Sequence, residues 1–326
     1  MPDIITLGEP IVDMVATEPS PDLVSALHFT KAAGGAPINV AAAVARLGGS
    51  AGVIAKAGGD HFGDFMRRTL EGIGVDLEGF VQDPDFPTQL AFVSKDAAGV
   101  PDFAFHVKKQ SADTMLQIDD IDAEYLGAGV IFHFGTITLI HEPVRSATRH
   151  ALRVARDQGL LISLDPNLRL TLWPSPDDAL RVFLQTVPEC DVLKVSEEEL
   201  VFLTGQRELE AGAQAAMEMG PELVLVTRGP EGAYFYRADG VRGSLPGFAV
   251  EVADTVGCGD ACVGAMLLQF VEAEPDVEDL TAQQLADMVR FANAAAALTA
   301  TGAGVMGSLP EREAVEKMLA PPETPL

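Results

Sequence analysis

Basic residues are scarce in this 326-residue sequence, with 22 lysines and arginines against 48 aspartates and glutamates. The formal net charge at pH 7 is therefore −26. Nucleic acids and anionic membrane surfaces both attract proteins through basic patches, so this charge argues against either as a partner. An anionic small molecule would have to be held locally, by backbone amides, a metal ion or a few basic side chains.

Cysteine is rarer still, and Cys190, Cys258 and Cys262 are its three occurrences. Their spacing is not that of a metal-ligand array, so we expect all three to be small, reduced hydrophobic residues. The sequence also lacks an uninterrupted apolar run of about 20 residues, and Met1–Ile4 does not have the basic and apolar layout of a signal peptide. We therefore expect a cytoplasmic protein.

Two common nucleotide-binding motifs are also missing. No Gly-x-x-x-x-Gly-Lys-Ser/Thr stretch occurs, and no Gly-x-Gly-x-x-Gly follows the first apolar run. The first absence excludes a P-loop site, and the second argues against a Rossmann dehydrogenase. A nucleotide would have to be held by another kind of anion-binding turn and by shallow loops.

Short apolar runs alternate with helical patterns along most of the chain. The runs typical of buried parallel strands are Ile4–Leu7, Gly52–Ala55, Val130–Phe134, Leu160–Leu164, Val192–Val195 and Leu223–Thr227. The helical patterns are Ala36–Leu47, Asp60–Ile73, Glu142–Gln158, Pro176–Thr186, Glu208–Met219, Cys258–Glu272, Thr281–Thr301 and Glu311–Leu319. This rhythm predicts an α/β fold with an open, mostly parallel sheet and helices on both faces. We expect one domain over residues 1–326.

One region breaks the β-α rhythm. Gln89–Lys95 and Asp102–His106 flank a turn-like stretch, which predicts a β-hairpin, and Ile11–Thr17 has no helical period either. The hairpin could be an ordinary sheet edge or part of a separate small β-unit.

The most informative stretch is Asp254–Asp260, which reads Asp-Thr-Val-Gly-Cys-Gly-Asp and leads into a run of small residues. It predicts a glycine-bracketed turn that opens into a helix, where free backbone amides and the helix dipole bind anionic oxygens. Asp260 is unexpected beside such a pocket, because a carboxylate repels phosphate. It either stabilises the helix start or takes a proton from a hydroxyl group that attacks the phosphate.

A second punctuated helix start lies near the N-terminus. Gly34, Gly35 and Pro37 precede an alanine-rich run that ends at Gly48. Asn39 is a polar amide placed early in this otherwise apolar helix. It could be a buried, satisfied amide or a ligand for sugar hydroxyl groups.

Together the two segments resemble the signature regions of the ribokinase/phosphofructokinase-B family of carbohydrate kinases. The first resembles the glycine-glycine-x-x-x-asparagine stretch that binds sugar, and the second resembles the aspartate-threonine-x-glycine-x-glycine-aspartate stretch with the catalytic base and the anion hole. The resemblance spans nearly the whole chain. Three intermediate segments resemble the fructokinase branch in particular, namely Asp165–Trp173, Lys194–Gly205 and Thr227–Gly232.

The resemblance implies a sugar site and a lid. Asp260 would be the base, with the backbone of Gly257, Cys258 and Gly259 as the anion hole. The sugar would be bound by Asp13, Gly34, Gly35, Asn39, Gln89, Phe105 and Arg169, although Phe105 could instead only pack the lid. The lid would be a small β-sheet formed by insertions at roughly 11–34 and 88–107, and its exposed edges would pair two subunits into a homodimer.

The resemblance also implies where the phosphoryl donor and its cations lie. ATP would be bound near Lys194, Thr227, Gly229, Gly232, Asn293 and Gly302. Glu199 would organise Mg²⁺ indirectly; Ser196 stands where the family has asparagine, so only Glu199 is carried over. The main chain around Asp254 and the 299–308 segment would hold K⁺.

The activity implied is an ATP-dependent sugar kinase, in first place a fructokinase. The closest alternative is a 2-keto-3-deoxygluconate kinase, whose substrate carries a carboxylate and would need a basic group such as His106, Lys108 or Lys109 near the lid. Ribokinase and nucleoside kinase activities are more remote. A non-catalytic sugar-binding protein is the alternative of another class, but such a protein would be expected to lose Asp260 first.

Overall fold

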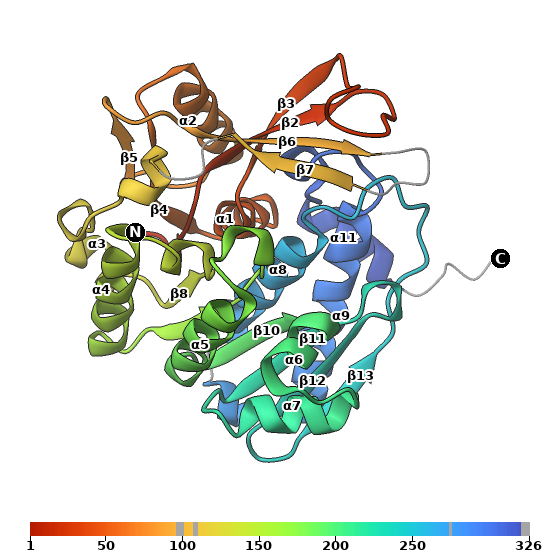
Figure 1. The fold of residues 1–326 in the computed structure, drawn as a ribbon. Helices are drawn as coiled ribbons and strands as arrows, with labels where there is room; N and C mark the ends of the chain where they lie inside the picture. The colour runs from red at the N-terminus through yellow and green to blue at the C-terminus, as the bar shows by residue number, and fades with distance from the viewer. Residues whose placement is uncertain (96–100, 107–109, 274–275, 321–326) are drawn as a thin grey trace.

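A nine-stranded sheet forms the centre of the molecule in the computed structural model, which describes residues 1–95, 101–106, 110–273 and 276–320. Figure 1 shows this sheet with helices packed around it. Its strands are β1 (Ile4–Leu7), β4 (Ala51–Gly58), β5 (Phe80–Asp83), β8 (Ile131–Phe134), β9 (Leu161–Leu164), β10 (Val192–Ser196), β11 (Leu223–Thr227), β12 (Ala233–Arg237) and β13 (Arg242–Leu245).

The strand order is β13-β12-β11-β10-β9-β8-β1-β4-β5, and every neighbouring pair from β11 to β5 is parallel. The predicted open, mostly parallel sheet is therefore confirmed. The sequence analysis did not predict β5 at one edge or the antiparallel β12 and β13, which extend the other. In a parallel sheet, ligands bind beyond the carboxyl ends of the strands, so the site is expected along that end of the sheet.

Helices cover both faces of the sheet, as predicted. They are α1 (Ala36–Arg46), α2 (His61–Ile73), α3 (Ala123–Gly127), α4 (Val144–Asp157), α5 (Pro176–Thr186), α6 (Glu197–Thr204), α7 (Leu209–Met217), α8 (Cys258–Ala273), α9 (Ala282–Thr299), α10 (Val305–Ser308) and α11 (Arg312–Leu319). All eight expected helices occur; the pattern Glu142–Gln158, for example, is observed as Val144–Asp157. The sequence analysis did not predict α3, α6 or α10.

Two hydrophobic cores result, one on each face of the sheet. Helices α1, α8 and α9 pack together in one core, and α4, α5, α6 and α7 contribute to the other. Strand β11 shows why a parallel strand reads as a continuous apolar run, because Leu223 and Leu225 enter the first core while Val224 and Val226 enter the second. A strand buried on both faces has no polar alternation.

A separate four-stranded sheet lies at the top of Figure 1 and has the order β3-β2-β6-β7. Its strands are β2 (Ile11–Ala16), β3 (Phe29–Gly34), β6 (Gln89–Lys95) and β7 (Pro101–Phe105). The predicted hairpin is confirmed by the antiparallel pairing of β6 with β7, and its turn lies outside the described residues. Strand β3 was not predicted, because its exposed Thr30 and Lys31 break any apolar pattern.

The remaining expectations about the chain concern cysteines and membranes. Cys190, Cys258 and Cys262 are all free thiols, as predicted. Among the helices that the structure describes, none is both long and apolar enough to cross a membrane.

Candidate active site

A cavity of about 810 Å³ opens at the carboxyl ends of the parallel strands. It is lined by residues that follow β1, β9 and β10, by the start of α1, and by the turn that precedes α8. The small sheet contributes Asp13 and Phe105 from β2 and β7. Both signature regions of the sequence therefore meet at one hollow, with the small sheet beside it.

Asp260 lies in the first turn of α8 and is bound by Asn39 of α1. The Asn39 Nδ2 group donates a 2.7 Å hydrogen bond to Asp260 Oδ2, and both side chains are buried. Gly264 lets the two helices approach, because a Cβ there would lie 2.8 Å from the Cβ of Ala43. The close packing of α1 against α8 therefore fixes the geometry of the acid.

Burial raises the pKa of Asp260 to about 6, although the hydrogen bond from Asn39 opposes this rise. Asp165 raises the pKa further, while Lys194 and Arg169 lower it. An acid with a pKa close to but below 7 is mostly ionised at neutral pH and accepts a proton readily, which suits a general base. The Asn39 Oδ1 atom has no partner in the described structure and can accept a hydrogen bond from a hydroxyl group.

The turn before α8 needs glycine. Gly257 has a φ of +82°, and a Cβ there would lie 2.4 Å from Val305 Cγ1. The amides of Gly259 and Asp260 belong to the first helical turn and have no intrahelical acceptor, so they can bind anionic oxygens. The amide of Cys258 differs, because it already donates to the Thr255 carbonyl at 3.3 Å. Cys258 itself does not line the cavity.

Lys194 forms a buried ion pair with Asp165. Its Nζ lies 2.8 Å from Asp165 Oδ2; Lys194 is the middle residue of β10, and Asp165 directly follows the neighbouring strand β9. Burial disfavours the ammonium, yet Asp165, Glu199 and Asp260 outweigh burial and raise the pKa of Lys194. A Cβ on Gly259 would lie 3.0 Å from Lys194 Nζ, so the ammonium also lies against the anion-binding turn.

Glu199 connects two segments of the cavity wall through its carboxylate. Oε1 accepts from the Leu168 amide at 2.7 Å, and Oε2 accepts from the Ser196 amide at 2.8 Å. Ser196 Oγ in turn accepts from the Glu199 amide at 3.2 Å, which completes the capping box of α6. Both oxygens of Glu199 are thus engaged, and any effect on a metal ion would be indirect.

Asp13 lies on β2 next to Gly34 of β3. A Cβ on Gly34 would lie 2.4 Å from Asp13 Oδ2, so a larger residue there would displace the carboxylate. Burial raises the pKa of Asp13 to about 7, and the exposed Arg169 on the cavity wall opposes that rise. Gly35, which caps α1 with a φ of +107°, has no space for a Cβ against the Glu9 carbonyl.

The other expected residues divide between the cavity and its surroundings. Phe105 and Thr227 line the cavity, whereas Gln89 is buried and lines an adjoining cavity. The structure does not place Gly229, Gly232, Asn293 or Gly302 on the cavity wall. The Asn293 amide is buried and donates to the carbonyls of Leu245 and Pro246 at 3.1 and 3.3 Å. A nucleotide role for these four residues stays a prediction.

Asp254 precedes the turn, and its segment is joined to the end of α9. The amides of Ala253 and Asp254 donate to the Ala300 carbonyl at 2.8 and 3.2 Å. The two loops expected to hold a monovalent cation therefore lie side by side.

Glu9 is the residue that the sequence analysis missed. It lines the cavity, is 2% exposed, and burial raises its pKa to about 7. The sequence did contain a signal, because Glu9 comes two residues after β1 and therefore lies at the carboxyl end of a central parallel strand.

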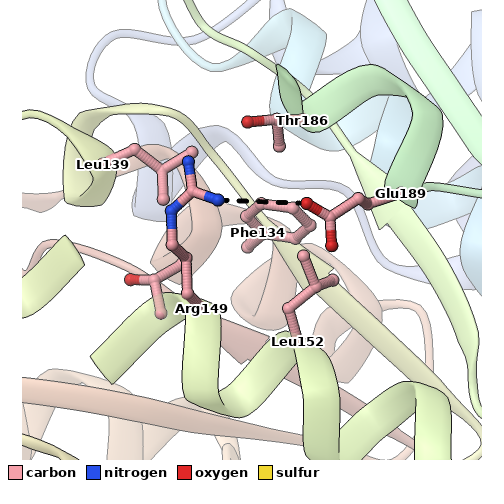
Figure 2. A pocket seen from close by; sticks show the side chains of 7 residues that line it. Phe134, Leu139, Arg149, Leu152, Thr186 and Glu189 are labelled. Carbon is pink, nitrogen blue, oxygen red and sulfur yellow. Dashed lines mark ion pairs between the residues drawn. The ribbon is translucent and has the colours of Figure 1, made fainter. Parts of the chain in front are cut away.

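Another hollow, seen in Figure 2, lies between α4 and the end of α5. Arg149 of α4 faces Glu189 across it at 4.0 Å, and Phe134 and Leu152 form its apolar wall. None of the expected site residues lines it, so we do not assign it to the chemistry.

A mostly parallel α/β sheet, a small second sheet and a buried aspartate at an anion-binding helix start together define the class of ribokinase-like carbohydrate kinases. The chain belongs to the pfkB family of carbohydrate kinases, whose family model matches residues 1–312.

Curated relatives and solved structures agree with this membership. Fructokinase-1 of Oryza sativa subsp. japonica is 41% identical over 317 residues, which cover 97% of each chain. The ATP-bound fructokinase of Xylella fastidiosa is 30% identical, with a TM-score of 0.88 over 98% of each chain. A double mutant of the Vibrio cholerae O395 fructokinase, solved with fructose, ADP and potassium, is 34% identical, with a TM-score of 0.85 over 98% of each chain.

Proposed function

We propose that this carbohydrate kinase is a fructokinase, which transfers the γ-phosphoryl group of ATP to the 6-hydroxyl of fructose. The hydrogen bond between Asn39 and Asp260 carries the proposal, because it sets a base beside free helix-start amides in a cavity lined by further hydroxyl-binding groups. Relatives about 40% identical over almost the whole chain are fructokinases, which supports fructose as the sugar.

The chemistry follows from the residues that meet at the cavity. The Asp260 carboxylate takes the proton of the attacking hydroxyl as the oxygen–phosphorus bond forms and the bond to the ADP oxygen breaks. The amides of Gly259 and Asp260 stabilise the transferring phosphoryl oxygens. Asp13 and the Asn39 carbonyl oxygen hold neighbouring hydroxyl groups of the sugar, and Arg169 pairs with a hydroxyl or a phosphoryl oxygen.

Lys194, expected near the phosphates of ATP, would act there through its charge. Because its ammonium is bound to Asp165 and lies against Gly259, it supplies fixed positive charge beneath the anion-binding turn. The ATP itself would extend from this turn past Thr227 towards Gly229, Gly232, Asn293 and Gly302.

Mg²⁺ and K⁺ fit the site in different ways. Among the described residues, no group of three or more His, Cys, Asp or Glu side chains could hold a metal ion, so Mg²⁺ would be held mainly by phosphate oxygens. Bound there, it would neutralise charge on those oxygens, and Glu199 would shape the wall beside it. K⁺ would be held by main-chain carbonyls where the Asp254 segment meets Ala300.

The charge of the cavity favours a neutral sugar. Glu9, Asp13 and Asp260 line it together with one exposed arginine, Arg169. The expected alternative substrate, 2-keto-3-deoxygluconate, would place its carboxylate among these three acids. Of the basic candidates near the lid, His106 is exposed, and Lys108 and Lys109 lie outside the described residues.

We further propose that residues 1–326 form one domain and that the small sheet is its lid. The small sheet adjoins the cavity through Asp13 and Phe105, where closure would exclude water that competes for the phosphoryl group. Its free edge strands β3 and β7 would pair with those of a second subunit.

A coupled ADP-release assay tests the function. The purified protein is given ATP and, in turn, fructose, glucose, ribose, adenosine and 2-keto-3-deoxygluconate, and NMR locates the phosphate. We expect the highest kcat/KM for fructose with phosphate on its 6-hydroxyl. A higher kcat/KM for 2-keto-3-deoxygluconate would overturn the sugar assignment, and no ADP release with any acceptor would overturn the kinase assignment.

A further inference from the structure

A second cavity of about 860 Å³ adjoins the first. The two share Glu9, Ile11, Phe105 and Ile137 as a common wall. The residues of the anion-binding turn and Asp260 line only the first cavity. The second cavity therefore continues the acceptor site at the end remote from the reacting hydroxyl.

The wall of the second cavity contains buried polar atoms that lack partners. Glu9, Gln89 and Trp173 are 2%, 5% and 8% exposed. Glu9 Oε2, Gln89 Oε1 and Trp173 Nε1 have no hydrogen-bond partner in the described structure, and neither does Asp113 Oδ1. An unsatisfied buried polar group is unfavourable, so a ligand that completes these hydrogen bonds would be bound favourably.

The rest of the lining mixes apolar side chains with polar ones such as Thr138 and Glu142. Leu172 and Trp173 form one side, and Met115 forms another. The segment of Met115 is fixed by the buried Lys56, whose Nζ lies 3.3 Å from the Met115 carbonyl and 2.7 Å from Asp120 Oδ2. The described lining residues include His141 but no lysine or arginine, and the carboxyl groups of Glu9, Asp113 and Glu142 outnumber it.

These features select a class of ligand. The indole N–H of Trp173 requires a hydrogen-bond acceptor. The carboxylate oxygens of Glu9 and Asp113 and the amide oxygen of Gln89 instead accept hydrogen bonds. A hydroxyl group does both, an ammonium only donates, and an anion would be repelled by the carboxylates. Aromatic and aliphatic walls fit the C–H faces of a sugar ring.

We propose that the second cavity is a subsite for a further neutral sugar unit, next to the sugar that is phosphorylated. This inference rests on the proposed function, because it places the anomeric end of fructose towards Glu9 when the 6-hydroxyl meets Asp260. Sucrose presents such a unit, with glucose on the anomeric carbon of fructose and a free 6-hydroxyl on the fructosyl ring. The transfer is unchanged: the hydroxyl oxygen bonds to phosphorus, ADP leaves and Asp260 takes the proton.

The experiment compares sucrose, fructose, and fructose with added free glucose in the ADP-release assay. Thr171, which is exposed and lines only the second cavity, is replaced in Thr171→Trp to fill it. Gln214→Trp adds the same side chain on an exposed position of α7 outside both cavities and is the matched control. Trp173→Phe keeps an aromatic side chain and removes the N–H donor.

We expect sucrose to be phosphorylated, or to compete with fructose, in the wild type and in Gln214→Trp. Thr171→Trp and Trp173→Phe should lower the apparent affinity for sucrose about tenfold, while the KM for fructose stays within about twofold of the wild-type value. An effect of free glucose that Thr171→Trp abolishes would show that the subsite takes a separate sugar molecule. The inference fails if fructose is phosphorylated but neither sucrose nor glucose has an effect that Thr171→Trp removes. Absence of fructose turnover would instead contradict the proposed function.

Discussion

Asn39 Nδ2 lies 2.7 Å from Asp260 Oδ2 although the two residues are 221 positions apart in the chain. The bond joins the two glycine-rich helix starts that the sequence marks as signatures. It also leaves Asn39 with one free acceptor atom and Asp260 with one carboxylate oxygen that Asn39 does not bind. The pair can therefore act as one unit, in which the amide orients the base and the base faces the hydroxyl.

The pH profile of kcat tests this unit. The pKa of Asp260 is raised to about 6, so kcat should fall as the pH drops below about 6 and the carboxylate takes up a proton. The hydrogen bond from Asn39 lowers that pKa. Asn39→Leu should therefore raise the midpoint of the acidic limb, the pH range in which kcat falls on acidification, by about one pH unit. Asn293→Leu removes a buried amide that binds main-chain carbonyls instead, and its limb should stay in place. An unmoved limb in Asn39→Leu would contradict the coupling.

The buried pair of Lys194 and Asp165 gives a stability prediction. Lys194→Met leaves the Asp165 carboxylate buried without its partner and should lower the free energy of unfolding by about 3 kcal/mol, measured by urea denaturation. The double variant Lys194→Met/Asp165→Asn removes both charges and should recover much of that loss. Equal losses in the single and double variants would mean that the ion pair is not the cause.

Potassium provides a prediction about the loops beside the anion-binding turn. If carbonyls of the Asp254 and Ala300 segments hold K⁺, the enzyme should be faster in K⁺ than in tetramethylammonium at equal ionic strength. The measurement is kcat at saturating fructose and ATP. Equal rates in the two salts would argue against a cation at this position.

Two exposed apolar residues allow a test of the dimer. Val24 and Leu27 are 93% and 83% exposed in the connection between β2 and β3. Light scattering should give the mass of a dimer for the wild type, and Val24→Asp/Leu27→Asp should shift it towards a monomer. Val130→Asp, at a half-exposed apolar residue far along the chain from the small sheet, should leave the mass unchanged. A monomeric wild type would exclude pairing through the lid.

The sequence indicated the fold well where one physical signal dominated. Strands buried on both faces, such as Leu223–Thr227, read as apolar runs, and glycine with Pro37 marked the start of α1. Strand β3 could not be recognised, because its pairing with β2 stabilises exposed polar residues that have no strand pattern of their own. The three consecutive glutamates of α6 indicated a helix start, but the sequence analysis did not include this short helix, although Ser196 and Glu199 form a capping box.

The site was predictable at its two glycine-rich turns and less so between them. The cavity does bring Asp13, Asn39 and Asp260 together, as the resemblance implied. The ion pair of Lys194 with Asp165 depends on β9 and β10 being neighbours, which no local pattern specifies. The same holds for the second cavity, whose walls come from segments far apart in the chain.

The central claim is that Asp260 is the base that activates the sugar hydroxyl. The most direct measurement combines kcat of Asp260→Asn with the affinity of this variant for fructose by calorimetry. The amide keeps the shape of the side chain and cannot take the proton, so kcat should fall at least about 100-fold while fructose still binds. Turnover close to that of the wild type would contradict the account.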